Sequence, residues 1–102
     1  MSVSLQVIYP IGDETSFDYD YYLSTHMALV GEYMGPHIER TLVTKGLAGG
    51  PDTPPGFYAV ATILFGDQRA FDAAMTASAP VLADIPKFTN TRPQMLIGEV
   101  VG

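Results

Sequence analysis

The side chains best suited to chemistry gather in residues 17–26, which hold four aromatic residues and one of the two histidines of the chain. Histidine has a reference pKa of about 6.5, so a modest shift lets His26 remove or return a proton near neutral pH. The hydroxyls of Tyr21 and Tyr22 could donate hydrogen bonds to an enolate or phenolate as its charge develops. This segment therefore predicts a site for an oxygen-bearing substrate, with His26 as a general base or as a hydrogen-bond donor to that substrate.

A second unusual stretch, residues 84–88, supplies an acid. Asp84 could orient the His26 imidazole or act as a second acid in the reaction. In the alternative interpretation, His26 packs under a sheet with a backbone carbonyl as its partner, and Asp84 only caps a broken helix. The sequence leaves both interpretations open. We carry forward His26, Tyr22 and Asp84 as the candidate catalytic residues.

The segment that contains His26 is predicted to be a helix that ends at Met34. Asp18 places negative charge at the positive end of this helix, and Thr15, three residues earlier, completes a capping pattern. At the other end, Gly35 can adopt the left-handed conformation that closes a helix. Four-, three- and four-residue steps predict one shared stripe. That stripe consists of Tyr22, His26, Leu29 and Tyr33.

Alternating apolar residues predict four strands, at residues 3–9, 40–46, 58–65 and 94–101. A second helix is expected to begin after Asp67 as its N-cap, and Pro80 is expected to interrupt it. The resulting order, β-α-β-β-α-β, predicts an α+β fold in which both helices cover one face of a four-stranded antiparallel sheet. We expect a single domain over residues 1–102.

Several of these strands are apolar on both faces, although two helices can cover only one face of the sheet. In residues 58–65, for example, Tyr58, Val60 and Leu64 alternate with other apolar residues. The uncovered face must be buried against something else. A second copy of the chain is the simplest candidate, because a two-fold contact needs only one self-complementary surface. The sequence therefore predicts a homodimer.

The charge balance excludes several classes of partner. Eleven acidic residues against five basic ones give a net charge of -6, so a nucleic acid would be repelled. Because the chain has no cysteine, it can form no disulfide or thiolate metal site. No stretch approaches the ~20 apolar residues of a membrane-spanning helix, and the N-terminus lacks the basic region of a signal peptide. We expect a soluble, cytoplasmic protein that binds neither nucleic acid nor membrane.

Several local patterns occur in one register along nearly the whole chain. They are Tyr9-Pro10, Phe17-Asp18, Tyr21-Tyr22, His26-Met27, Gly46-Leu47-Ala48-Gly49, Ala83-Asp84-Ile85-Pro86, Phe88-Thr89 and Ile97-Gly98-Glu99-Val100. In this order they resemble the EthD-like proteins of the dimeric α/β-barrel superfamily. The resemblance implies a ferredoxin-like fold whose two sheets pair into a barrel, with a pocket between sheet and helices in each subunit.

The resemblance suggests the function of this protein only in broad terms. Its name comes from gene clusters that degrade an ether fuel additive, and its members are often labelled reductases. Relatives by fold include cofactor-free monooxygenases, lactone isomerases, and polyketide cyclases or decarboxylases. The resemblance thus implies a small-molecule pocket but leaves the reaction open.

The residues support no cofactor. A dinucleotide site needs glycines in a turn from a strand to a helix, whereas the glycines at 46–50 lead into a proline-rich loop. His26 and His37 lie on different elements, and neither has a His or Glu partner at helical spacing, so no metal site is predicted. Some barrels of the superfamily bind haem through one histidine, which leaves haem ligation by His26 open.

Three functions fit these observations. In the first, the protein is a cofactor-free enzyme that acts on a small hydrophobic, oxygenated molecule. In the second, it is a binding or accessory protein that carries or shields a pathway intermediate, and in the third it is a purely structural dimer. The candidate substrate-binding residues are Tyr21, Leu29, Tyr33, Phe57, Tyr58 and Phe88.

Overall fold

One antiparallel sheet organises the computed structural model, which describes residues 1–102. Its strands are β1 (Val3–Pro10), β2 (Arg40–Lys45), β3 (Phe57–Phe65) and β4 (Gln94–Glu99). The strands lie in the order β2-β3-β1-β4, and all neighbours are antiparallel. The predicted β-α-β-β-α-β order is therefore confirmed. The last strand ends at Glu99 rather than at Val101.

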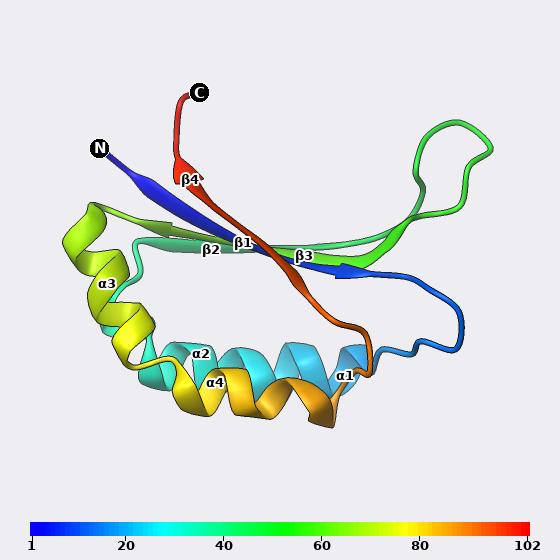
Figure 1. The fold of residues 1–102 in the computed structure, drawn as a ribbon, viewed down its shortest axis with the longest axis horizontal. Coiled ribbons are helices and arrows are strands. Elements are labelled where there is room, and N and C mark those ends of the chain that lie inside the picture. The colour runs from blue at the N-terminus through cyan, green and yellow to red at the C-terminus, as the bar shows by residue number, and fades with distance from the viewer.

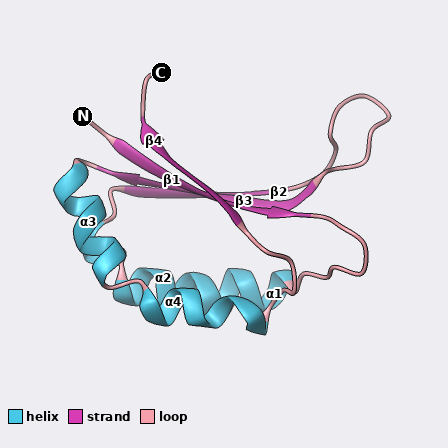
Figure 2. Ribbon diagram, in the orientation of Figure 1, coloured by secondary structure: helices cyan, strands magenta, loops and turns pink.

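All helices lie on one face of this sheet (Figures 1 and 2). The first helical segment comprises α1 (Tyr19–Tyr21), the π-helical turn η1 (Tyr22–His26) and α2 (Met27–Tyr33), followed by the 3-10 turn η2 (Gly35–His37). The second comprises α3 (Gln68–Thr76), α4 (Ala79–Asp84) and the 3-10 turn η3 (Ile85–Lys87). No helix combines the length and the apolar character needed to cross a membrane.

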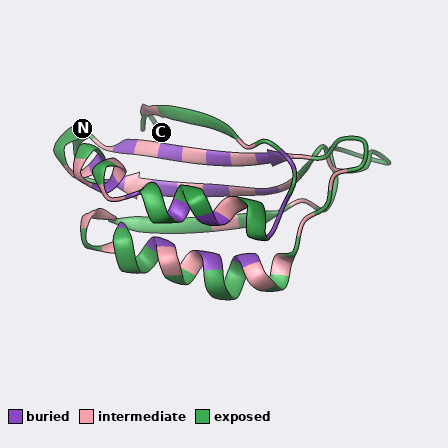
Figure 3. Ribbon diagram, turned by 60° about the horizontal axis from the view of Figure 1, so that its bottom comes forward, coloured by how far each residue is buried: buried purple, intermediate pink, exposed green.

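The core lies between the sheet and the helices. Along β1 and β3, every second residue is buried, as Figure 3 shows. The buried strand residues are Val3, Leu5, Val7, Tyr9, Ala59, Ala61, Ile63 and Phe65. This strict alternation follows from the two-residue period of a strand, which turns one set of side chains toward the helices. It fixes the register in which the strands present their residues to the candidate site.

The first helix is bounded differently from the prediction. Asp18 is its N-cap, and its Oδ1 accepts a hydrogen bond from the Tyr21 N–H at 3.1 Å. Thr15 does not cap the helix, because its hydroxyl is engaged with Gly12 and with the Tyr58 hydroxyl. Gly35 is not left-handed either: the chain continues from the helix into a 3-10 turn that begins at Gly35. Both details of the predicted caps were wrong.

The second helical segment begins and breaks as expected. The Asp67 side chain accepts a hydrogen bond from the Ala70 N–H at 2.8 Å, so the predicted N-cap is confirmed. Pro80 lies in the first turn of α4, where its missing N–H leaves no helical hydrogen bond unmade. The proline thus separates two helices, and the second of them ends at Asp84.

Residues 89–91, which precede β4, form hydrogen bonds with the end of β1 and with the segment between β1 and α1. The Thr89 hydroxyl donates to the Ser16 carbonyl at 2.6 Å, and the Thr91 hydroxyl donates to the Pro10 carbonyl at 2.7 Å. Asn90 accepts a hydrogen bond from the Ser16 N–H at 2.9 Å. Because Thr89 is buried, water cannot easily take its place as a hydrogen-bond partner, and loss of its bonds costs free energy.

Replacing Thr89 by valine, which has nearly the same shape, is expected to lower the free energy of unfolding by about 1–2 kcal/mol. The change leaves the Ser16 carbonyl and the Thr91 N–H without the partner they now share. Urea denaturation would measure the loss. Thr41→Val is the matched control, because Thr41 is exposed on the edge strand β2 and should cost little. Equal stability of the two variants would contradict the prediction.

The face of the sheet without helices carries apolar side chains. Leu42 and Leu96 are aligned with Thr62 and Gln6 across this face, and they are 54% and 55% exposed. The edge strand β4 is exposed along nearly its whole length. The single chain leaves these apolar side chains open to solvent.

Candidate functional site

A cavity of about 40 Å³ lies between the sheet and the helices. Fourteen of its sixteen lining residues are hydrophobic, and the wall includes His26 and Tyr22. The strands contribute Leu5, Val7, Tyr9, Ala61, Ile63 and Met95; the helical segments contribute Met27, Val30, Met34, Met75, Ser78, Val81, Leu82 and Ile85. The predicted hollow beside the first helix therefore exists. The cavity is small compared with pockets for drug-sized ligands, which measure about 300–1,000 Å³.

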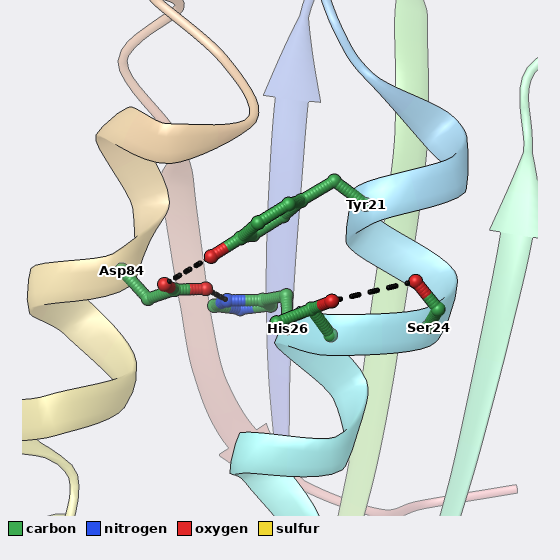
Figure 4. A network of polar contacts seen from close by, with 5 residues as sticks. Tyr21, Ser24, His26 and Asp84 are labelled. Atoms are coloured by element: carbon green, nitrogen blue, oxygen red, sulfur yellow. Dashed lines mark hydrogen bonds and ion pairs between the residues drawn. The ribbon is translucent and has the colours of Figure 1, made fainter.

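His26 and Asp84 form a buried pair beside this cavity. The His26 Nδ1 lies 3.0 Å from Asp84 Oδ2, and the two residues are only 3% and 5% exposed. The other carboxylate oxygen, Oδ1, accepts a hydrogen bond from the Tyr21 hydroxyl at 2.7 Å. Figure 4 shows both rings reaching from the first helical segment to Asp84 on α4. Since the carboxylate occupies Nδ1, Nε2 is the nitrogen left to exchange a proton.

The π-helical turn η1 explains how both side chains reach one carboxylate. Tyr21 and His26 are five residues apart, and in an α-helix this spacing places two side chains about 140° apart around the axis. In η1 the Met27 N–H instead bonds the Tyr22 carbonyl, five residues back. Such a wide turn brings residues five apart onto the same side. The turn therefore assembles the group Tyr21–Asp84–His26.

The electrostatics favour a neutral imidazole beside an ionised carboxylate. Desolvation by burial lowers the pKa of His26 and outweighs the opposing effect of Asp84. For Asp84, desolvation by burial acts to raise the pKa, but the hydrogen bonds from Tyr21 and His26 bring it below the ordinary value. At neutral pH, His26 thus donates Nδ1–H to Asp84 and keeps a lone pair on Nε2. This is the protonation state that a general base requires.

The two buried tyrosines of the cavity wall stay protonated. Burial raises the pKa of Tyr22 to about 12. The pKa of Tyr9 is raised even more, mainly by burial and to a smaller extent by the neighbouring Tyr22. The Tyr22 hydroxyl is buried and has no hydrogen-bond partner. An unpaired buried hydroxyl costs free energy, so Tyr22 carries an unused hydrogen-bond donor within a residue of the cavity wall.

The stability of the protein is expected to fall as the pH drops below about 6.5, the reference pKa of histidine. The folded state lowers the pKa of His26 and of Asp84, so the unfolded chain binds more protons. The stability that His26 and Asp84 contribute is fully present above their unfolded-state pKa values of 6.5 and 3.8. It is lost as the pH falls below each value in turn. Urea denaturation of wild type and His26→Gln between pH about 7 and about 5 isolates the His26 contribution. Identical pH slopes in the two proteins would contradict the prediction.

The structure brings only some of the predicted site residues together. His26 and Tyr22 line the cavity, and Asp84, which does not line it, is hydrogen-bonded to His26 Nδ1. Six predicted substrate-binding residues are absent from the cavity wall: Tyr21, Leu29, Tyr33, Phe57, Tyr58 and Phe88. The predicted helical stripe was right at Tyr22 and His26, which are buried, but it is continued by Val30 and Met34; Leu29 is only partly buried and Tyr33 is exposed.

These side chains have other positions. Tyr33 and Phe57 are exposed, and the Tyr58 ring stacks on Phe17 at 5.3 Å between centroids. Phe88 is buried at the centre of an aromatic cluster, and its ring lies 4.6 Å from the His26 ring. It also contacts Tyr9, Phe17, Tyr21 and Tyr22. Phe88 therefore supports the site from within the core.

Sequence reasoning missed part of the cavity wall. Met27, Met34, Met75 and Met95 all line the cavity, although none of them was predicted to be a site residue. Their flexible thioethers adapt to irregular apolar shapes. The only sequence signal was their recurrence on elements that face the core.

The wall does not fit a haem. A cavity of about 40 Å³ is far below the volume of a porphyrin-sized ligand, and the Nδ1 atom of His26 is already bonded to Asp84. Haem ligation by His26 is therefore not supported by the residues present. No group of three or more His, Cys, Asp or Glu side chains is placed to hold a metal ion.

The sheet order, the helices on one face and the β-α-β-β-α-β connectivity define an α+β protein of the ferredoxin-like class. The EthD domain matches residues 13–92, which include both helical segments and the whole of the Tyr21–Asp84–His26 group. The chain belongs to the EthD domain family. The expected resemblance is thus confirmed.

Solved structures agree with this assignment. An EthD-like protein from Ralstonia eutropha JMP134 is 34% identical, with a TM-score of 0.88 over 99% of this chain and 93% of that chain. A dimeric ferredoxin-like protein of unknown function from Thermobifida fusca YX has 12% identity and a TM-score of 0.64 over 98% and 92%. SnoaB from Streptomyces nogalater, a cofactor-independent oxygenase, has 10% identity and a TM-score of 0.61 over 98% and 95%. The last two show the fold alone. No curated protein matches the chain.

Proposed function

We propose that this protein is a cofactor-free enzyme that removes a proton from a small hydrophobic, oxygenated molecule, with His26 as the general base. The observation that carries the proposal is the buried imidazole itself. Its Nδ1 is bonded to a carboxylate, its pKa is lowered mainly by burial, and it forms part of the wall of an apolar cavity. Perturbed titratable groups in such positions gather at functional sites.

The roles of the three residues follow from their contacts. His26 Nε2 takes the proton, and the Asp84 carboxylate stabilises the imidazolium that forms. Tyr22 donates its unpaired hydroxyl to the oxygen on which negative charge develops. Because the wall is apolar, these interactions act with little screening by water. Proton transfer of this kind typically accelerates a reaction by about 10²–10⁴-fold.

The size of the cavity limits how the substrate binds. A volume of about 40 Å³ admits only a group of a few atoms. We therefore place the reactive end of the substrate in the cavity and its remainder against Leu82 and Met95, which line the cavity and are exposed. The fold supports this proposal, since SnoaB performs cofactor-independent oxygenation on the same architecture.

Hydrogen exchange in deuterium oxide tests the proposed reaction without knowledge of the natural product. Small hydroquinones, phenols and 1,3-diketones would be incubated with the protein, and mass spectrometry would follow deuterium incorporation at carbon and any product that forms with dioxygen. Protein-dependent incorporation in at least one class is the expected result. Binding of these ligands, without exchange or product in any class, would reject the enzyme proposal in favour of a non-catalytic carrier.

We also propose that a second copy covers the bare face of the sheet. Exposed Leu42 and Leu96 and the dimeric state of the Thermobifida fusca protein support this arrangement. Sedimentation at micromolar concentration is expected to give twice the chain mass of 11.0 kDa. Leu96→Lys should shift the equilibrium toward monomer, whereas Glu32→Lys on the exposed side of α2 should not. A wild-type protein that sediments at 11.0 kDa would contradict the proposal.

A further inference from the structure

We propose that Tyr21 is a positioning residue, whose hydroxyl holds the Asp84 carboxylate so that its second oxygen stays directed at His26 Nδ1. The inference rests on the proposed role of His26 and concerns how that base is kept in orientation. The sequence predicts Tyr21 to be a substrate-binding residue. The structure instead directs its hydroxyl at Asp84 Oδ1, at 2.7 Å (Figure 4).

The geometry gives each carboxylate oxygen one donor. Tyr21 bonds Oδ1, and His26 bonds Oδ2 at 3.0 Å. The torsion that orients a carboxylate is soft, so a single hydrogen bond would fix the group poorly. Two donors on opposite oxygens remove this freedom. The carboxylate can then hold one tautomer and one orientation of the imidazole, as orienting groups behind catalytic histidines do.

The Tyr21 ring is itself braced. It stacks on Phe88 with 6.3 Å between ring centroids and an interplanar angle of 26°. The same Phe88 ring lies 4.6 Å from the His26 ring. Phe88 therefore supports both donors of the carboxylate from one position in the core. A phenylalanine at position 21 would preserve this stacking and remove only the hydroxyl, which makes Tyr21→Phe a clean test.

Other titratable groups near the pair must be considered in any titration. Tyr22 on η1 stacks on the His26 ring, Tyr9 reaches the same cavity from β1, and Lys87 on η3 attracts the Asp84 carboxylate. The pKa values of both tyrosines are raised well above neutrality, so neither changes charge near pH 7. The pKa of Asp84 is lowered as well, so the imidazole is the group of this site whose ordinary pKa lies nearest to neutral pH.

The experiment is a ¹⁵N NMR titration of His26 in wild type, Tyr21→Phe and Tyr33→Phe. Removing the Tyr21 hydroxyl leaves more of the carboxylate charge to act on the imidazole, so the His26 midpoint is expected to move upward. Faster exchange of the Nδ1 proton should accompany the shift, because the carboxylate is less fixed. Tyr33→Phe, an exposed position on α2, should match wild type. A folded Tyr21→Phe variant whose His26 midpoint and Nδ1 proton exchange both match wild type would overturn the inference.

A second pair of variants shows whether Tyr21 acts through Asp84. In an Asp84→Asn background, adding Tyr21→Phe is expected to leave the His26 midpoint where Asp84→Asn alone puts it. An equal shift in both backgrounds would overturn the positioning role. These titrations need no substrate. If His26→Gln kept full exchange activity, the proposed function would fail while the titration result stood; an unaffected titration would remove the role of Tyr21 and leave the base in place.

Discussion

Replacing His26 with glutamine is expected to lower the rate of proton exchange by about 10²–10⁴-fold, while the protein remains folded. Glutamine fills much of the space of the imidazole and can hydrogen-bond to Asp84, but it cannot accept a proton at neutral pH. The effect should appear in the rate and not in ligand affinity, because the lost interaction is made in the transition state. Deuterium incorporation into the most reactive compound of the panel measures it.

His37→Gln is the matched control, since it replaces the other histidine, which lies on η2. Its exchange rate should equal that of wild type. Circular dichroism and the urea midpoint would show that His26→Gln is folded under the assay conditions. A folded His26→Gln protein with the wild-type rate would mean that the imidazole is not the base. The alternative interpretation, in which His26 is only a packed core residue, would then hold.

Replacing Phe88 with alanine is expected to lower the free energy of unfolding by about 3–5 kcal/mol. The side chain is 3% exposed and contacts the rings of Tyr9, Phe17, Tyr22 and His26. Its removal leaves a cavity that this many rigid rings cannot close. Such a loss is a large part of the roughly 5–15 kcal/mol that stabilises an ordinary domain. In a chain of this size the melting temperature should fall by roughly 15–30 °C.

Calorimetry of Phe88→Ala beside Phe57→Ala provides the comparison. Phe57 is an exposed phenylalanine at the start of β3, so its truncation should cost no more than about 0.5 kcal/mol. Phe88→Leu keeps most of the volume and should lie between the two. Similar melting temperatures for all three variants would show that the aromatic cluster is not a principal source of stability.

The sequence predicted the fold because its signals are local. The alternation along β1 and β3, the cap at Asp67 and the break at Pro80 each depend on a few neighbouring residues. The interruption of the first helix by a π-helical turn was not predictable. Such a turn forms when tertiary contacts favour one wide turn over a regular helix, and no residue in Tyr22–His26 marks it.

That one turn accounts for the errors made on the first helical segment. On a regular helix, Leu29 and Tyr33 share a stripe with His26, whereas the observed segment buries Val30 and Met34. The pairing of Tyr21 with Asp84 depends on the same turn and could not be inferred from spacing. The pairing of His26 with Asp84 was one of the two interpretations that the sequence left open, and the structure shows it. A buried histidine has few possible partners.

The joining of residues 89–91 to the segment before α1 affects how the molecule must fold. His26 and Asp84 are 58 positions apart, and the bond between Ser16 and Asn90 spans 74 positions. Closing a loop of that length costs conformational entropy, which the packing around the pair must offset. During synthesis, the imidazole–carboxylate contact cannot form until Asp84 has left the ribosome, 58 residues after His26. A nascent chain that stops before Asp84 therefore carries His26 without its carboxylate partner.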